Sequence, residues 1–277
     1  MSANPQASLI TGERLHLHHG PIDLIIGVEG PERQACFTAA AERFQTVLTE
    51  LTRELPDLRR PLSPQQHFVH PVANRMAQAV RPFGNVFVTP MAAVAGAVAD
   101  EVLSAMVVCQ RPAKAYVNNG GDIALHLSGQ TSFSIRGPAG DIALRAKDKA
   151  RGVATSGWRG RSHSLGIADA VTVLARTAAQ ADVAATLIAK AVDLPDHPGI
   201  TRVPASGLNP DSDLGDRLVT AHVGPLSLCD IQRALAAGLH MADQFAKHGH
   251  IDSVVLSLQG HIQTHSAHHP IGAPAHA

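Results

Sequence analysis

The sequence predicts a mixed α+β fold in which helices pack on a sheet. Apolar residues recur at helical spacing in several long segments, and short runs of β-branched residues lie before, between and after them. These helices and strands do not alternate strictly along the chain, whereas a doubly wound parallel sheet requires strict alternation. A mixed sheet is therefore the expected architecture.

The first part of the chain predicts one hairpin and two helices. Strand-like runs flank the turn at 19–21, which indicates a β-hairpin over 15–26. Apolar residues then keep helical spacing from 30 to 55, and a shorter helix is expected over 72–80. The first of these two helices is amphipathic, so it should cover one face of the sheet.

A central segment, residues 91–106, is small or apolar at nearly every position. This composition predicts a helix that is buried on most sides. Thr89 suits its N-cap, and Pro90 suits its first turn because the missing N–H would have no partner there. Asp100 and Glu101 are the only charges of the segment, so one of them should face a polar group.

Later segments complete the sheet and add two helices. We expect a single domain over 12–260, with room for two intimately packed subdomains, and flexible termini at 1–11 and 261–277. Residues 193–214 are rich in Pro, Asp and Gly and predict a long surface loop. The expected strands are 115–117, 123–127, 131–136, 141–147, 168–175, 218–223 and 251–258, and the expected helices are 178–192 and 227–247.

The composition argues against several classes of partner. The 277 residues carry 23 basic and 23 acidic side chains, so nothing indicates a nucleic acid as a partner. We recognise no signal peptide and no apolar run long enough to span a bilayer, so no membrane partner is expected. Three cysteines without paired spacing suit a reducing cytoplasm. Many of the 17 histidines crowd into 261–276, where adventitious metal affinity is the expectation.

Two polar stretches interrupt the expected elements. Residues 118–122 read Asn-Asn-Gly-Gly-Asp between two strands, and such a backbone can take positive φ and approach a ligand closely. A hairpin turn without a ligand would explain the same residues. The second stretch, 151–164, contains three Arg, three Gly and four hydroxyl residues, which suits phosphate oxygens. An exposed loop without a ligand is the alternative for this stretch.

One helical pair offers oxygen ligands to a metal ion. Asp182 and Thr186 are spaced i, i+4 in the helix expected over 178–192, so they lie one turn apart on one face. A carboxylate and a hydroxyl are suitable ligands for one hard cation. A Thr hydroxyl bonded to a carbonyl of its own helix is the alternative explanation.

Four short motifs, in this order, resemble the superfamily of FAD:protein FMN transferases, called ApbE-like proteins. The resemblance covers roughly 85–192, and three segments are closer still to the UPF0280 family within it. The superfamily motifs are 92–100, 118–122, Thr-Ser-Gly at 155–157 and Ala-Asp-x-x-x-Thr at 181–186; the UPF0280-like segments are 20–26, 89–100 and 155–162.

The resemblance implies a fold, cofactors and a site. The fold would be ApbE-like (T-fold-like), with largely antiparallel sheets and packed helices. FAD and Mg²⁺ would be the cofactors, and Asp182, Thr186 and a backbone carbonyl near Ala93 would hold the metal. A flavin or another phosphorylated small molecule would be the ligand, an acceptor protein could receive FMN, and a homodimer is allowed. The implied cofactor-binding residues are Asn119, Gly120, Gly121, Asp122, Thr155, Ser156, Gly157, Arg159 and Arg161.

The chain also departs from the transferases. Their Ala-Lys-Gly is replaced by Val-Ala-Gly at 94–96, so the lysine is absent, and the substitutes available are Arg151, Arg159 and Arg161. Their His-Ile-Ile-Asp-Pro is reduced to His163 and Asp169. We therefore expect binding of a phosphorylated ligand to persist while FMN transfer is slow.

Two functions are consistent with these features. One is an enzyme that uses FAD and Mg²⁺ to pass FMN to a protein or to cleave the FAD pyrophosphate. The other is a non-transferring ligand-binding protein of the same fold in a metabolic pathway, such as sulfur assimilation. A scaffold protein fits less well, because the polar motif residues exceed what packing needs.

Overall fold

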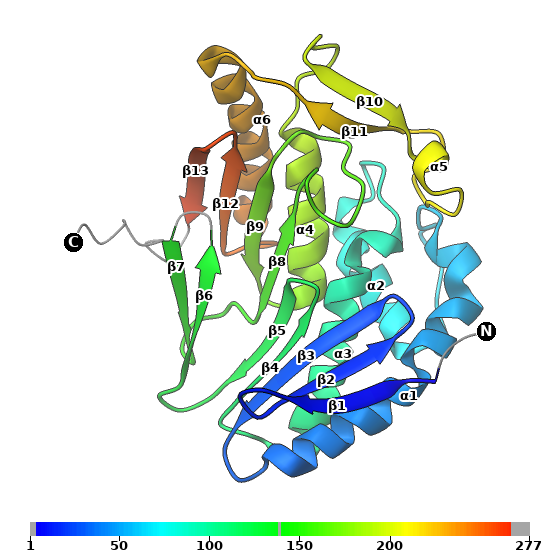
Figure 1. Cartoon of the computed structure of the whole chain (residues 1–277), viewed down its shortest axis with the longest axis vertical. Helices are drawn as coiled ribbons and strands as arrows, with labels where there is room; N and C mark the ends of the chain where they lie inside the picture. Colours follow the sequence, from blue (N-terminus) through cyan, green and yellow to red (C-terminus); the bar gives the residue numbers. More distant parts are fainter. Residues whose placement is uncertain (1–3, 138–139, 267–277) are drawn as a thin grey trace.

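The computed structural model describes residues 4–137 and 140–266, and its main feature is one sheet of nine strands (Figure 1). Its strands are β1 (Gln6–Ile10), β2 (Arg14–His19), β3 (Ile22–Glu29), β4 (Lys114–Asn119), β5 (Asp122–Leu127), β8 (Gly152–Ser156), β9 (Ala170–Ala175), β12 (Ser253–Leu258) and β13 (His261–Ser266). They lie in the order β1-β2-β3-β4-β5-β8-β9-β12-β13, and each is antiparallel to its neighbours. The expected mixed α+β fold with a largely antiparallel sheet is confirmed.

Helices cover one face of this sheet (Figure 1). On this side lie α1 (Arg33–Leu58), α2 (Pro71–Val80), α3 (Val94–Gln110), α4 (Ala178–Ala191) and α6 (Leu228–Lys247), with the 3-10 turns η1 (Arg81–Phe83) and η2 (Pro90–Ala93). The short helix α5 (Ala205–Leu208) lies apart from the large sheet and contacts β10. Helix α1 contacts β2 and β3, α3 contacts β4 and β5, α4 contacts β8 and β9, and α6 contacts β12 and β13. The main covering helices therefore follow the strand order across the sheet.

Two hairpins lie outside the large sheet. The hairpin of β6 (Ser132–Gly137) and β7 (Gly140–Arg145) packs through Ile142 and Leu144 against Leu125 of β5. Because successive side chains of a strand point to opposite faces, this hairpin covers the face turned away from the helices. The second hairpin, β10 (Ile200–Pro204) with β11 (Leu218–Val223), lies at the α4 end of the molecule (Figure 1).

Three segments differ from the expected structure. The long loop expected over 193–214 contains β10 and α5, because β10 pairs with a strand that comes later in the chain. Residues expected in flexible termini form β1 and β13, which are paired edge strands. Their side chains are mostly exposed, so no apolar alternation marked them in the sequence. Residues 1–3 and 267–277 of those termini lie outside the described residues.

Helix α3 is the core helix between α1 and α4. Val98 of this helix and Ala93 just before it have no exposed surface, as expected for an apolar helix, whereas Val94 is half-buried and Val108 is exposed. By length and composition alone, Pro90–Val108 could cross a membrane, with a mean hydropathy of 1.7, so the expectation that no run is long enough was wrong. In the fold this segment packs against α1, α4, β4 and β5.

The start of this helix differs from the simple capped helix that was expected. Pro90 opens the 3-10 turn η2 and α3 begins only at Val94. Thr89 has the extended backbone of an N-cap residue, but its hydroxyl does not cap the helix. It donates instead to the carboxylate of Asp213, which joins the start of the helix to the segment after α5.

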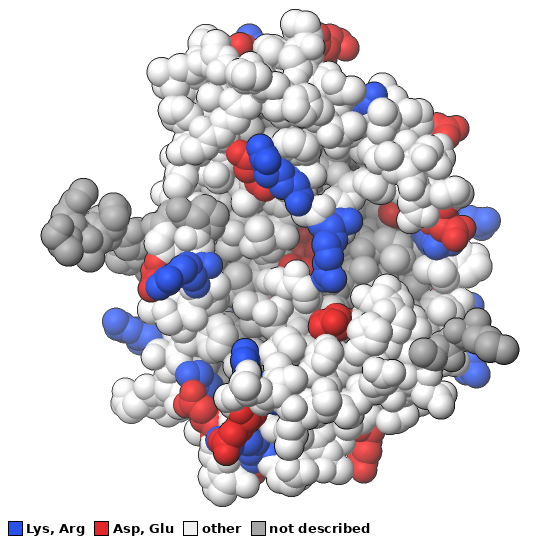
Figure 2. Space-filling view, viewed as in Figure 1, with Lys and Arg blue, Asp and Glu red and all other residues white. Residues whose placement is uncertain are grey.

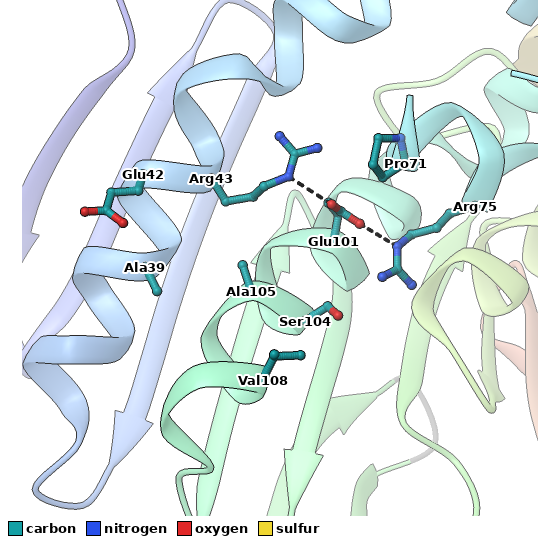
Figure 3. A pocket seen from close by; sticks show the side chains of 9 residues that line it. All are labelled: Ala39, Glu42, Arg43, Pro71, Arg75, Glu101, Ser104, Ala105 and Val108. Carbon is teal, nitrogen blue, oxygen red and sulfur yellow. Dashed lines mark hydrogen bonds and ion pairs between the residues drawn. The ribbon is translucent and has the colours of Figure 1, made fainter. Parts of the chain in front are cut away.

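Both charges of α3 have polar partners. Asp100 accepts hydrogen bonds from the first backbone N–H groups of α4. Glu101 lies between two arginines (Figure 3): it accepts from Nε of Arg43 on α1 at 2.8 Å and from Nε of Arg75 on α2 at 2.7 Å. Burial alone would raise the pKa of Glu101, but these two hydrogen bonds and the positive charges of both arginines together outweigh burial and lower its pKa. The three helices are thus held together by one carboxylate that stays charged at neutral pH.

Replacing Glu101 with Gln should destabilise the protein by about 3 kcal/mol at pH 7, because the half-buried guanidinium of Arg75 loses its anion and that of Arg43 keeps only Glu50. The lowered pKa of Glu101 means that this contribution is present above the usual pKa of a glutamate and is lost as the pH falls through the lowered value. Urea unfolding at pH 7 and at pH 3 measures both effects. Asp141→Asn, which breaks the exposed pair with Arg136, is the control and should change nothing measurable. Equal urea midpoints for both variants and the wild type would contradict this role of Glu101.

Candidate functional site

A cavity of about 480 Å³ lies beside the starts of α3 and α4. Its walls are the segment 87–95 before and within α3, the loop 161–165 after β8, one face of α4 and the segment 209–214. Figure 2 shows this face of the molecule hollowed near its middle, with basic and acidic side chains around the hollow. The cavity is larger than a single metal ion needs and is in the range of small-molecule sites.

Close packing of α3 on α4 forms the floor of this cavity. A Cβ at Gly96 would lie 2.3 Å from the carbonyl oxygen of Ala178, so only glycine permits the contact. The Gly96 N–H donates to Oδ2 of Asp182 at 3.1 Å. Asp100 accepts from the N–H groups of Ala178 at 3.0 Å and Ala179 at 2.9 Å, so α3 caps the start of α4.

The Asn-Asn-Gly-Gly-Asp turn joins β4 to β5 next to this contact. Asn119 is buried and its Nδ2 donates to the carbonyl of Ala95 at 3.1 Å, which fixes the start of α3 to the sheet. Gly120 and Gly121 have φ of +66° and +114°, which other residues rarely adopt. A Cβ at Gly120 would also collide with the guanidinium of Arg161, so this arginine lies directly over the turn.

Two carboxyl groups share the cavity. Burial raises the pKa of Asp122 to about 7, although the Thr155 N–H and the guanidinium of Arg161 act in the opposite direction. Burial, and then the charge of Asp122, raise the pKa of Asp182 well above its ordinary value. Two desolvated carboxyl groups that repel each other bind protons or a cation more strongly than isolated ones.

The structure brings five of the predicted site residues to the cavity wall. They are Asp122, Ser156, Arg161, Asp182 and Thr186. Asp182 and Thr186 thus line one cavity together with the Asp122 end of the glycine turn, whereas Gly120 and Gly121 themselves are not part of its wall.

Other predicted residues lie beside the cavity and hold its walls. Thr155 bonds through its N–H to Asp122 and through its hydroxyl to Thr172 at 2.9 Å. The chain at Gly157 passes close to the carbonyl of Asp169, so a Cβ at Gly157 would lie only 2.4 Å from that carbonyl oxygen. Ala93 is fully buried behind the wall that its neighbours in η2 and α3 form.

The three arginines considered as substitutes for the missing lysine have separate positions. Arg161 lines the cavity. Arg159 donates to Oδ1 of Asp169 at 2.7 Å and stacks on Trp158 at 4.7 Å, away from the cavity wall. Arg151 donates to backbone carbonyls near the end of the β6–β7 hairpin, including that of Ala146. Only one of the three can therefore reach a ligand here without rearrangement.

Sequence reasoning missed several cavity residues. Lys190 extends the face of α4 that carries Asp182 and Thr186, at position i+8, so the same helical spacing could have identified it. Phe87 and His163 also line the cavity. They lie in irregular segments, and no periodic pattern indicates where such side chains point.

The donor set fits a magnesium ion that also binds a ligand. Among residues 4–137 and 140–266, no three His, Cys, Asp or Glu side chains form a group that could hold a metal by themselves. Two carboxylates and one hydroxyl are nevertheless available in the cavity, and all their donor atoms are oxygen. Mg²⁺ is commonly held by one or two carboxylates, with phosphates of the substrate and water completing the octahedron. The residues therefore fit the ion, provided that a phosphorylated ligand shares it.

A family model described as AbpE bacteria matches residues 6–264. The chain belongs to this family. It is similar to a UPF0280 protein of Methanopyrus kandleri, with 39% identity over 133 residues, 42% of this chain and 47% of the relative. The chain thus spans about half the length of that relative. A UPF0280 protein of Methanosphaerula palustris is 34% identical over 183 residues, 61% of this chain and 73% of the relative. These matches confirm the resemblance to UPF0280 and ApbE-like proteins.

Two solved structures are also similar. The ApbE protein of Thermotoga maritima gives a TM-score of 0.47 at 11% identity and covers 97% of each chain. The flavinyl transferase ApbE of Pseudomonas stutzeri, in its apo form, gives a TM-score of 0.40 at 13% identity, covering 96% of this chain and 95% of that one. At these scores the likeness says nothing about individual residues or chemistry.

Replacing Asp122 with Asn should stabilise the metal-free protein above pH 7. The raised pKa means that the folded state holds this proton more tightly than the unfolded state, whose Asp pKa is about 4. The Asp122 contribution to stability therefore decreases as the pH rises from about 4 to about 7. Urea unfolding in EDTA at pH 5 and pH 8 should show a larger gain for Asp122→Asn at pH 8. Asp57→Asn, on the exposed end of α1, should show no such difference, and a pH-independent effect of Asp122→Asn would contradict the shift.

Proposed function

We propose that this protein binds a flavin nucleotide, FAD in the first place, in the cavity beside the starts of α3 and α4 with the help of Mg²⁺. The observation that carries the proposal is the convergence of Asp122, Asp182 and Thr186 with the basic side chain of Arg161 in one cavity. Hard oxygen donors beside an arginine suit a metal-bound phosphate group. The resemblance of the motifs at 118–122, 155–157 and 181–186 to those of FAD:protein FMN transferases supports flavin as the organic part of the ligand.

Each residue of the cavity wall would have its own role in ligand binding. Asp182 and Thr186 would hold the metal, and Asp122, close enough for its charge to act on Asp182, would supply a second carboxylate. Arg161 would bind phosphate oxygens with its planar fork. Apolar side chains of the wall, such as Met91 and Leu187, would pack against the uncharged part of the ligand. When bound, Mg²⁺ would neutralise the charge of the pyrophosphate oxygens.

Asp182→Asn should abolish the Mg²⁺ dependence of FAD binding while the fold persists. The amide is a poor metal ligand but can still accept the hydrogen bond from Gly96 N–H. In calorimetric titrations with FAD, 5 mM Mg²⁺ should strengthen binding to the wild type by about tenfold or more, as expected for a lost or gained charged contact, and should leave the variant unaffected. Asp57→Asn is the control. A wild type that binds FAD equally with and without Mg²⁺, or does not bind it, would overturn the proposed site.

Arg161→Ala should weaken binding of FAD by about tenfold, because a charge-assisted phosphate contact is lost. Arg159→Ala is a matched control two residues away, since its guanidinium is paired with Asp169 outside the cavity. The sequence suggested both arginines, and only Arg161 of the two lines the cavity. The same titrations measure both variants. If Arg159→Ala weakens binding and Arg161→Ala does not, the assignment of the cavity wall is wrong.

A second function, cleavage of FAD with or without transfer of FMN to a protein, is favoured by one observation. His163 lines the cavity with an exposed imidazole that could accept the proton of the attacking group, which is water in cleavage and an acceptor hydroxyl in transfer. Asp169 lies outside this wall, where it accepts from Trp158, Arg159 and the backbone of Gln259. We expect transfer to a Ser or Thr acceptor to be slow. Incubation with FAD and Mg²⁺, with AMP and FMN measured by chromatography, tests the reaction, and a loss of products in His163→Ala would assign it to this cavity.

A further inference from the structure

The cavity has a basic end that the proposed function leaves unused. Lys190 lies eight residues after Asp182 on the same face of α4, about 12 Å along the helix axis. Both residues line the cavity, together with Thr186 between them. Metal-binding oxygens and a lysine therefore lie at opposite ends of one row of side chains.

Lys190 has no anionic partner within the described part of the chain. None of the hydrogen bonds or ion pairs there involves its ammonium group, which lies 6.0 Å from the centre of the Phe87 ring. The guanidinium of Arg217 lies 3.4 Å from the centre of the same ring. Burial, and then the charge of Arg217, lower the pKa of Lys190. Two cations thus flank one aromatic ring, and a bound anion would relieve the repulsion between them.

Two further carboxylates of the cavity wall, those of Asp211 and Asp213, have partners of their own. Asp213 accepts the hydroxyl proton of Thr89. Asp211 lies 3.8 Å from the guanidinium of Arg59. Neither carboxylate forms an ion pair with Lys190 within the described part of the chain. The basic end of the cavity is therefore open to an anion from outside the protein.

We propose that Lys190 is the binding residue of an anion subsite, which takes a carboxylate or phosphate group of the ligand at the end of the cavity away from Asp122. The proposal rests on the proposed function in taking this cavity as the ligand site. It adds that the ligand is elongated and acidic at two places, one at the Asp182 end and one at the Lys190 end. Phe87 lies beside the second place and can pack against an apolar or planar part of the same ligand.

The small number of lysines permits a direct test. The chain has five lysines, Lys114, Lys147, Lys149, Lys190 and Lys247. Reductive methylation with ¹³C-formaldehyde labels each amine and preserves its charge, and single Lys→Arg variants assign the signals. We would titrate the labelled protein in EDTA with inorganic phosphate and separately with succinate, at constant ionic strength set with chloride.

The Lys190 signal should shift saturably with phosphate, succinate or both, and the signal of the exposed Lys247 should not. A response to one anion only identifies the preferred chemistry, carboxylate or phosphate, and supports the subsite. Lys190→Met should weaken binding of the same anion by about tenfold or more, measured by calorimetry. Lys190→Arg should retain binding, and Lys247→Met is the control. A Lys190 signal that moves no more than that of Lys247 would overturn the proposal.

The outcome is separable from that of the proposed function. Asp182→Asn should keep the phosphate or succinate response of Lys190, because the anion needs no metal there. If the Lys190 signal shifts with an anion but the protein does not bind FAD, the flavin proposal is overturned and an acidic ligand of another class is supported. If the Lys190 signal does not shift with either anion but FAD binding depends on Mg²⁺, only the anion-subsite proposal is overturned.

Discussion

The candidate site depends on how closely α3 approaches the start of α4. Gly96 makes this possible, because any side chain there would collide with the backbone of Ala178. Asp100 then caps α4 and Asp182 bonds back to the Gly96 N–H, so each helix satisfies polar groups at the start of the other. Asn119 ties the same helix start to the sheet. Chain segments about 80 residues apart in sequence are thereby fixed within hydrogen-bond distance.

This packing also creates the electrostatic character of the cavity. It places Asp122 and Asp182 in a partly desolvated space where both pKa values are raised. Such a pair is unfavourable in its fully charged form, and a divalent cation would stabilise it. Arg161 over the glycine turn and Lys190 at the far end add positive charge at two separate places. We infer that the cavity is suited to a ligand with phosphate and further acidic groups, bound with a metal.

Much of the fold was predictable because its elements carry strong local signals. Burial of the middle of α3 explains its apolar sequence, although Val108 near its end is 72% exposed. The Ser227 cap with Asp230 explains the start of α6. The edge strands β1 and β13 escaped prediction because exposure removes the alternation of apolar residues. β10 and α5 escaped because their partners lie elsewhere in the chain.

The site was predictable where it lies on regular elements. Helical spacing alone places Asp182 and Thr186 on one face, and the same rule extends to Lys190. Which arginine reaches the cavity was not predictable, because Arg159 and Arg161 differ only in the path of an irregular loop. That path is decided by Asp169, which holds Arg159 and Trp158 outside the cavity. Composition and spacing do not predict that Arg159 and Trp158 bond to Asp169.

The central claim is that Asp182 and Thr186 hold a metal ion which a phosphorylated flavin shares. A crystal structure of the protein grown with FAD and Mn²⁺, with anomalous data collected at the manganese edge, tests it most directly. The account predicts one anomalous peak within coordination distance, about 2.1–2.3 Å, of the Asp182 carboxylate and the Thr186 hydroxyl, and phosphate density next to it. An FAD molecule bound elsewhere, or a cavity without manganese in crystals that contain FAD, would contradict it.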